Sequence, residues 1–359
     1  MTVRKAFPFF WKYLLVVFTS CGLAFVISHQ AQAAVALTNP YEKVGTYAIE
    51  KTDQDWRDDK RERTMPVRIY VPKLNAASAV NKADAFETTT LFPVIIFSHG
   101  LGGSIAGGKT WGQHWASHGF IVVHLQHIGS DESVWKGKRE TAAIGDMKSA
   151  MSMTNLGLRV GDVHFAIDEI IKRAKEKDKL FALADTTKIG MSGHSFGAQT
   201  TLSVAGQNSP AARGQTGLDK RIRAAIALSP NARNKTNLDK QFGDIRMPFF
   251  SITGSLDGSV LNDQTEVVHR TLPYKHMPAN DKYLLVLAEG DHMIFGGHNP
   301  TARRAAQPRD NEIQRLVKSA TLAFWQSTLN ADAKATEWLK DSKSGFKAAL
   351  LPNDIFENK

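Results

Sequence analysis

Cysteine is almost absent from this sequence: Cys21 is the single one in 359 residues, and it lies within the first 33. The rest of the chain therefore has no disulfide bond, no thiol nucleophile and no cysteine-ligated metal site. Long hydrophobic runs are also scarce. Residues 13–27 are almost continuously apolar, and no other stretch approaches the roughly 20 residues of a membrane-spanning helix.

The N-terminal segment has the pattern of a secretory signal peptide. Three basic residues precede the apolar stretch, and the small-x-small sequence Ala31-Gln32-Ala33 follows it. We expect residues 1–33 to be removed by cleavage after Ala33, and residues 34–359 to act in a bacterial periplasm or outside the cell. The alternative is a retained membrane anchor, for which the apolar stretch is short.

The positive charge of the chain is not concentrated in clusters. The formal net charge is +10, and removal of the three signal-peptide cations leaves +7. The cations are scattered rather than interleaved with aromatic residues, which argues against nucleic-acid binding. We expect at most a loose electrostatic attraction to anionic envelope surfaces.

Short apolar runs alternate with amphipathic segments along residues 34–359. The apolar runs predict buried strands, and the amphipathic segments predict helices. The expected strands are 92–97, 120–125, 189–191, 222–228, 248–253 and 283–288, and the expected helices are 110–118, 156–177, a segment starting near 198, 312–329 and 334–351 with a break near 345. This alternation favours one doubly wound α/β domain with a mostly parallel sheet.

Two segments depart from this alternation. Residues 45–70 alternate between apolar and polar side chains and predict an antiparallel strand pair, joined by a very polar connector over 53–64. Residues 126–155 form a long polar insertion. Because long loops in compact domains tend to be functional, we expect this insertion to be a cap over the site.

One stretch organises the rest of the chain. The apolar run 189–191 is followed by Gly193-His194-Ser195-Phe196-Gly197, which matches G-x-S-x-G, and then by a segment that predicts a helix. A strand, a sharp turn and a helix with a serine at the apex form a nucleophile elbow. The turn strains the serine backbone, and glycines two residues away avoid steric clashes. We therefore expect Ser195 to be a nucleophile.

A serine nucleophile needs a base, and catalytic groups in such a fold gather at the carboxyl ends of the strands. Glu289-Gly-Asp-His292 follows the expected strand 283–288. We assign His292 as the base that takes the serine proton and returns it to the leaving group.

The acid that orients the histidine is expected after the preceding strand. Gly254-Ser-Leu-Asp257-Gly258 follows residues 248–253, and Asp257 is the first acid beyond that strand. Asp263 is the nearest competitor, with Asp244 behind it. The order serine, aspartate, histidine along the chain is that of α/β-hydrolases.

An oxyanion hole needs a second donor, from the loop after an earlier strand. Ser98-His-Gly-Leu-Gly-Gly-Ser104 follows the expected strand 92–97. We assign the two donors to the backbone N–H groups of Leu101 and Phe196.

The same loop carries a competing motif. Gly103 to Thr110 satisfies G-x-x-x-x-G-K-[ST], so a phosphate-binding function through Lys109 and Thr110 stays open, although five residues separate the first glycine from the strand end. His114 and His118 have the spacing of a zinc-binding helix, but the glutamate that such a site needs between them is missing. We expect no metal and no other cofactor.

Four motifs together resemble one branch of the α/β-hydrolases. They are His99-Gly-Leu-Gly-Gly103, Trp115-Ala-Ser-His-Gly-Phe-Ile-Val-Val123, Gly193-His-Ser-Phe-Gly197 and Gly290-Asp-His292. Over about 67–339 the chain is similar to the dienelactone-hydrolase-like and platelet-activating-factor-acetylhydrolase-like branch. Dienelactone hydrolases use a cysteine nucleophile where this chain has Ser195, so the serine branch of acetylhydrolases and esterases fits better.

The resemblance implies a single hydrolase domain, no cofactor, and a triad of Ser195, Asp257 and His292. It also implies hydrolysis of small-molecule or lipid carboxylic esters, with short-chain or acetyl esters favoured. A lipase or polyester hydrolase is the alternative on the same fold, and peptidase and thioesterase activities stay open because one triad serves all acyl transfers. A phosphate-loop nucleotide-binding protein and a catalytically silent binding protein are the alternatives from other classes.

Overall fold

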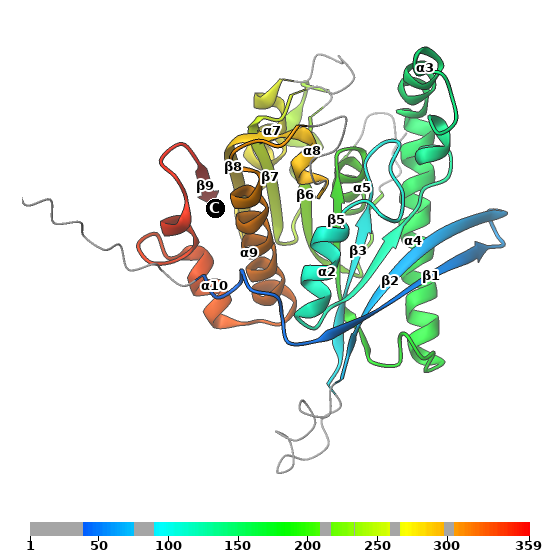
Figure 1. Ribbon diagram of the computed structural model, residues 1–359, viewed down its shortest axis with the longest axis horizontal. Coiled ribbons are helices and arrows are strands. Elements are labelled where there is room, and N and C mark those ends of the chain that lie inside the picture. The colour runs from blue at the N-terminus through cyan, green and yellow to red at the C-terminus, as the bar shows by residue number, and fades with distance from the viewer. Residues whose placement is uncertain (1–38, 75–89, 209–216, 233, 259–265, 298–304) are drawn as a thin grey trace, which may run out of the picture. The chain divides into compact units, whose positions relative to one another are not determined.

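The computed structural model describes residues 39–74, 90–208, 217–232, 234–258, 266–297 and 305–359. The predicted signal peptide, residues 1–33, and the competing acid Asp263 lie outside these residues. The described residues belong to one compact unit, Leu37–Lys359, in which they form a nine-stranded sheet (Figure 1).

The sheet is parallel at its centre and antiparallel at both edges. Across it the strands run in the order β1-β2-β4-β3-β5-β6-β7-β8-β9. Their bounds are β1 Ala48–Asp58, β2 Arg63–Lys73, β3 Phe92–Ser98, β4 Ile121–Leu125, β5 Ala184–His194, β6 Ile222–Leu228, β7 Phe249–Leu256, β8 Lys282–Asp291 and β9 Ile355–Asn358. The strands from β4 to β8 in this order are parallel, whereas β1, β2 and β9 pair antiparallel with their neighbours. This confirms the predicted α/β class and the antiparallel N-terminal pair.

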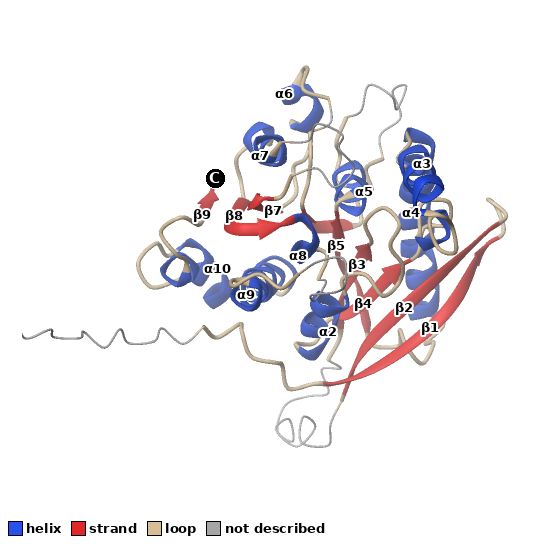
Figure 2. Ribbon diagram, turned by 45° about the horizontal axis from the view of Figure 1, so that its top comes forward, coloured by secondary structure: helices blue, strands red, loops and turns tan. Residues whose placement is uncertain are grey.

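Helices cover both faces of the sheet (Figure 2). One face packs against α4 (Met153–Lys175), α5 (Phe196–Val204), α6 (Leu238–Phe242) and α7 (Val267–His276). The other packs against α2 (Lys109–Ser117), α8 (His292–Phe295), α9 (Asp310–Leu329) and α10 (Ala333–Lys340). Because both faces are covered, the central strands are apolar on both sides, and every residue of β3 is buried.

Helix α4 shows how local sequence sets an element. Its N-cap Ser152 accepts a hydrogen bond from the Asn155 N–H at 3.2 Å, and three basic residues occupy its last turn. Val163, Ile167 and Ile170, three and four residues apart, are buried against the sheet. The helix starts three residues before the expected 156, because the cap, not the first apolar residue, decides where it begins.

The predicted connector over 53–64 is wrong. Strand β1 continues to Asp58 and β2 begins at Arg63, so the connection is a short turn. Arg68 holds Asp53 across the pair with two hydrogen bonds of 2.7 Å, while Trp56 and Met65 pair on the buried face. Polar residues on the solvent face of an edge hairpin therefore concealed the alternating pattern.

The insertion 126–155 is partly helical. It contains the 3₁₀ helix η1 (Glu132–Val134), the helix α3 (Glu140–Ala150) and the first turn of α4. Strand β9 was not expected from the sequence, since it is four residues long and only Phe356 in it is buried. The break expected near 345 separates α10 from the 3₁₀ helix η3 (Phe346–Ala349). Among the described residues, no helix combines the length and apolar character needed to cross a membrane.

Candidate active site

Ser195 stands at a sharp turn between β5 and α5. Its backbone has φ 57° and ψ −113°, a costly conformation for a residue with a side chain. A Cβ on Gly193 would collide with the Gly197 carbonyl, and a Cβ on Gly197 would collide with the Ser98 carbonyl. The Ser195 N–H donates to the Leu228 carbonyl at 2.9 Å, which ties the turn to β6. Gly193 is therefore needed for the close approach of α5 to β5, and Gly197 for its close approach to β3.

His292 links Ser195 to Asp257. His292 Nε2 lies 2.9 Å from Ser195 Oγ, and His292 Nδ1 lies 2.7 Å from Asp257 Oδ1. An ionised carboxylate can only accept, so Nδ1 carries the proton and Nε2 accepts from the serine hydroxyl. The structure thus brings these three predicted site residues into one hydrogen-bonded chain, although 97 and 35 positions separate its members in sequence.

Asp257 is fully buried at the end of β7. Thr253 Oγ1 donates to its Oδ2 at 2.8 Å, and Arg270 Nε lies 2.7 Å from its Oδ1. Burial works to raise the pKa of this carboxyl, but the hydrogen bond from His292 and the charges of His292 and Arg270 hold the pKa below its usual range. Asp257 is therefore ionised at neutral pH.

Arg270, on α7, is a residue that sequence reasoning missed. Its side chain is 5% exposed, and its guanidinium donates to the Ser229 carbonyl at 2.9 Å and to the Gly258 carbonyl at 3.0 Å. Its Nη2 also lies 3.1 Å from His292 Nδ1. No motif surrounds Arg270 in the sequence, so no signal there could have assigned it to this cluster.

Two neighbours hold His292 in place. Asp291 caps α8 by accepting from the Met293 and Ile294 N–H groups, each at 2.9 Å. His194 Nε2 lies 2.8 Å from the His292 carbonyl oxygen. The helix start and the elbow therefore hold the backbone at His292.

The loop after β3 lies against the nucleophile. A Cβ on Gly100 would be 3.5 Å from Ser195 Cβ, and Leu101 is the next residue of the loop. Phe196 is the first residue of α5, so its N–H has no acceptor within the helix. The residues of both predicted oxyanion donors thus belong to segments that adjoin Ser195.

A second Ser-His-Asp chain lies behind this loop. Ser98 Oγ is 2.8 Å from His127 Nε2, and His127 Nδ1 is 2.9 Å from Asp162 Oδ2. All three side chains are 0% exposed, so no substrate reaches the hydroxyl. Burial works against the Asp162 charge, but bonds from His127 and Arg63 lower the pKa of Asp162 to about 2. The hydrogen bonds among these three side chains link β3 to α4.

The phosphate-binding motif has several of its donors occupied. The N–H groups of Gly107, Gly108 and Lys109 donate to nearby carbonyls at 2.9, 3.0 and 3.4 Å. The Thr110 hydroxyl donates to the Gly297 carbonyl at 3.1 Å. A phosphate cradle needs such groups directed into a shared hollow, so this geometry does not favour a nucleotide site.

The histidines near the loop bind backbone carbonyls. His114 Nε2 lies 3.1 Å from the Tyr41 oxygen, and His118 Nε2 lies 2.9 Å from the Lys43 oxygen. In the part of the chain that the structure describes, no three or more His, Cys, Asp or Glu side chains are arranged to hold a metal ion.

The segment 126–155 packs on the same loop. Trp135 Nε1 donates to the Gly102 carbonyl at 2.6 Å, one residue beyond Leu101. In α3, Ala150 is the one buried residue, so most of this helix faces solvent. The segment thus contacts the loop of the candidate site.

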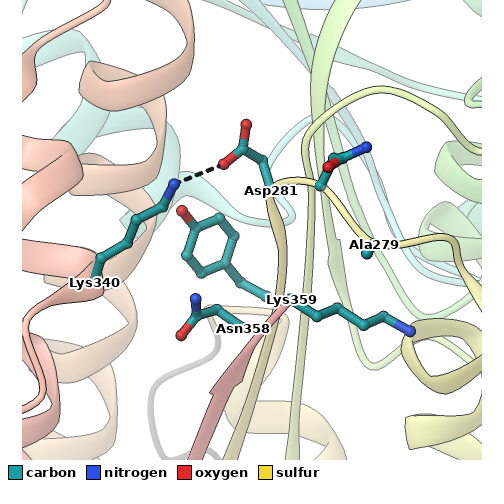
Figure 3. Close-up of a pocket in the computed structure, with 7 residues that line it drawn as sticks. Ala279, Asp281, Lys340, Asn358 and Lys359 are labelled. Atoms are coloured by element: carbon teal, nitrogen blue, oxygen red, sulfur yellow. Dashed lines mark hydrogen bonds and ion pairs between the residues drawn. The ribbon is translucent and has the colours of Figure 1, made fainter.

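A cavity of about 250 Å³ lies elsewhere, at the start of β8 (Figure 3). It is lined by Ala279, Asn280, Asp281, Tyr283, Lys340, Asn358 and Lys359. Lys340 and Asp281 face each other there in an ion pair of 3.0 Å. Ser195, Asp257 and His292 follow the carboxyl ends of their strands, so the cavity and the candidate site are at opposite ends of the sheet.

A family model matches residues 59–140: platelet-activating factor acetylhydrolase, isoform II. The matched region contains β3, the glycine-rich loop and β4, and it ends before Ser195. The match confirms the resemblance to this branch of the α/β-hydrolases that the sequence motifs indicated.

Curated relatives agree with this match. The platelet-activating factor acetylhydrolase of Canis lupus familiaris is 28% identical over 181 residues, which are 43% of this chain and 38% of that protein. The Bos taurus protein of the same name is 29% identical over 171 residues, 40% of this chain and 36% of the relative. The Cavia porcellus protein is 24% identical over 283 residues, 70% and 61% of the two chains. The chain thus spans less than two thirds of each of these relatives.

Proposed function

We propose that this chain, an α/β-hydrolase similar to platelet-activating factor acetylhydrolases, hydrolyses carboxylic esters through an acyl-enzyme on Ser195. The observation that carries the proposal is the hydrogen-bonded chain from Ser195 through His292 to the buried Asp257. Nucleophile, base and orienting acid within hydrogen-bond reach are the arrangement that acyl transfer requires.

In the proposed mechanism, His292 Nε2 takes the proton of Ser195 Oγ as the oxygen attacks the ester carbonyl. The tetrahedral intermediate places its oxyanion against the N–H groups of Leu101 and Phe196. His292 then gives the proton to the leaving alcohol, and a water molecule deacylates the serine with His292 again as base. Loss of one oxyanion donor would cost about 2.7–4 kcal/mol of transition-state stabilisation.

Asp257 contributes through the imidazole. Its carboxylate fixes the tautomer in which Nδ1 carries the proton, and it stabilises the imidazolium that forms when Ser195 attacks. The low pKa of Asp257 supports this role, because an acid that took up a proton would lose the charge that stabilises the imidazolium.

Esters with short acyl chains are the proposed substrates. The relatives carry the name acetylhydrolase, and the resemblance of the sequence motifs points to acetyl and other short-chain esters of small molecules or lipids. We also propose that the protein is exported and acts in the periplasm or outside the cell, on the evidence of the N-terminal pattern.

The test compares the purified protein with its Ser195→Ala variant on nitrophenyl esters from acetyl to palmitoyl. We expect turnover in the parent with an optimum at short chains, and a loss of at least about 10³-fold in the variant. An optimum at long chains would identify a lipase instead. Equal turnover in both proteins would exclude Ser195 from the mechanism.

The phosphate-loop alternative is tested with Lys109→Ala. Because Lys109 is exposed at the start of α2, this variant should keep the ester turnover of the parent. ATP binding by the parent that is lost in Lys109→Ala would favour the nucleotide function.

A further inference from the structure

Arg159 is a fully buried arginine on α4, immediately behind the loop of the candidate oxyanion hole. Its Nη1 donates to the His99 carbonyl at 2.7 Å, and its Nε donates to Ser130 Oγ at 2.8 Å. Burying a guanidinium is costly, and here its donors bind the backbone and a hydroxyl rather than a surface carboxylate. We therefore look for a structural role of the Arg159 guanidinium in the groups that it contacts.

Burial lowers the pKa of Arg159 to about 9, while the charges of Asp162 and Asp131 work in the opposite direction. The guanidinium therefore remains a cation at neutral pH. Its positive charge lies behind the segment where a negative charge would develop on the substrate.

The contacts of Arg159 orient one candidate donor. Its Nη2 lies 3.4 Å from the Gly100 carbonyl oxygen, which also accepts from the Gly103 N–H at 3.2 Å. In a trans peptide the C=O and the following N–H point in opposite directions. Because the Gly100 carbonyl is turned toward Arg159, the N–H of Leu101 is directed away from Arg159.

The same guanidinium orients the residue of the other candidate donor. The Arg159 Cζ atom lies 4.4 Å from the centroid of the Phe196 ring, a cation–π distance. Phe196 is 4% exposed and begins α5 directly after Ser195. One planar group thus touches the loop before Leu101 and the side chain of Phe196.

We propose that Arg159 is a positioning residue that holds both oxyanion donors, Leu101 and Phe196, in register with Ser195. The inference rests on the proposed ester hydrolysis at Ser195 and deepens it. Lysine cannot replace arginine in this role, since a point charge has neither the fork that reaches two carbonyls nor the plane that stacks on a ring.

The test uses Arg159→Lys, which keeps the charge and removes the fork. We expect kcat to fall about 10- to 100-fold while KM stays within about threefold, because misplaced donors weaken transition-state binding more than substrate binding. A trifluoromethyl ketone that adds reversibly to Ser195 should lose affinity by the same factor, since it also places an oxyanion in the hole.

Arg173→Met is the matched control. Arg173 lies on the same helix and also stacks on an aromatic ring, with its Cζ 5.1 Å from the Trp56 centroid, but it contacts Glu169 rather than the loop. We expect this variant to keep the kcat and the ketone affinity of the parent. Equal losses in both variants would mean that α4 needs an arginine for stability alone, and would overturn the inference.

Ser130→Ala is a milder variant, because it removes the hydroxyl that accepts from Arg159 Nε and leaves the charge in place. We expect kcat and ketone affinity to fall together by about 2- to 10-fold. If Arg159→Lys does not fold, parental values in Ser130→Ala would overturn the inference.

The two proposals fail in different ways. A parent that turns over no ester, or whose turnover survives in Ser195→Ala, would refute the proposed function. A working parent whose Arg159→Lys variant matches it in kcat and ketone affinity would refute only the role of Arg159. Loss of kcat with unchanged ketone affinity would also refute that role, because the oxyanion donors would then be intact.

Discussion

Arg270 forms an ion pair with Asp257 through Oδ1, the same carboxylate oxygen that His292 Nδ1 reaches; both distances are 2.7 Å. Thr253 occupies the other oxygen at 2.8 Å. All three of these close contacts of the Asp257 carboxylate are therefore with hydrogen-bond donors. This arrangement explains why a carboxylate with no exposed surface keeps its charge.

We predict that Arg270→Met lowers both activity and stability. Removing one partner of a buried ion pair leaves an uncompensated charge and typically costs about 3–5 kcal/mol. Urea unfolding should show this loss, and kcat should fall with it because Asp257 is no longer held. Arg246→Met is the control: Arg246 is 75% exposed and 3.9 Å from Asp244, so we expect a change below about 1 kcal/mol. Equal effects in the two variants would contradict the prediction.

We predict that the protein loses stability as the pH falls from about 6.5 toward 3. Burial lowers the pKa of His114 and of His124 to about 3, so both are neutral when folded and become protonated on unfolding below pH 6.5. Above that pH these histidines are neutral in both states and the stability is not reduced. Below it, each histidine lowers the free energy of unfolding by about 1.4 kcal/mol per pH unit.

Urea unfolding between pH 7 and 4 measures this slope. The double variant His114→Gln and His124→Gln should show a slope shallower by about 3 kcal/mol per pH unit, whatever its stability at pH 7. An unchanged slope would show that these two histidines do not take up protons on unfolding.

We predict that Gly197→Ala destabilises the elbow. The added Cβ would overlap the Ser98 carbonyl and push α5 away from β3, at a cost of about 2–4 kcal/mol. Since Ser195 and Phe196 move with α5, kcat should fall as well. Thermal unfolding and ester turnover measure the two effects.

Gly145→Ala is the control for that variant. Gly145 lies in the exposed helix α3, and apart from the adjacent backbone of that helix no atom lies within 4 Å of the added Cβ. Alanine is the better helix former by up to about 1 kcal/mol, so stability should stay or rise slightly. A Gly197→Ala protein as stable and active as the parent would disprove the close approach of α5 to β3.

We predict that the exported protein begins at Ala34. Residues 31–33 supply the small-x-small pattern that signal peptidase recognises after an apolar segment. Intact-mass measurement of protein purified from a periplasmic extract tests this, with an Ala31→Arg and Ala33→Arg variant as the uncleaved control. A parent that retains Met1 would contradict the cleavage and favour the membrane-anchor alternative.

Regular elements were predictable where one physical requirement dominated. The strand over 222–228 and the helix over 110–118 appear at or within one residue of their expected bounds, because apolar runs between covered faces and amphipathic periods leave little choice. The prediction of a connector over 53–64 was wrong because the strand of the edge hairpin alternates polar residues with the buried Trp56. Strand β9 was not predicted because four residues are too few to show an alternation of apolar and polar side chains.

The residues of the candidate site also fall into those that the sequence predicted and those that it did not. Ser195 was recognisable because the two glycines around it are a local steric requirement of the turn, and Asp257 and His292 because each follows a strand end. Arg270, Arg159 and the Ser98–His127–Asp162 chain have no such local signature. Many of their partners are distant in sequence, as with the 60 positions between Arg159 and His99 and the 41 between Arg270 and Ser229.

The sequence by itself determined the class of fold, the elbow and the order of the three candidate site residues, because these follow from periodicity and from what a tight turn permits. The tertiary structure alone decided which buried cations surround them. A buried arginine is tolerated only where carbonyls or carboxylates from several strands and helices converge on it, and that convergence exists only after the sheet has assembled.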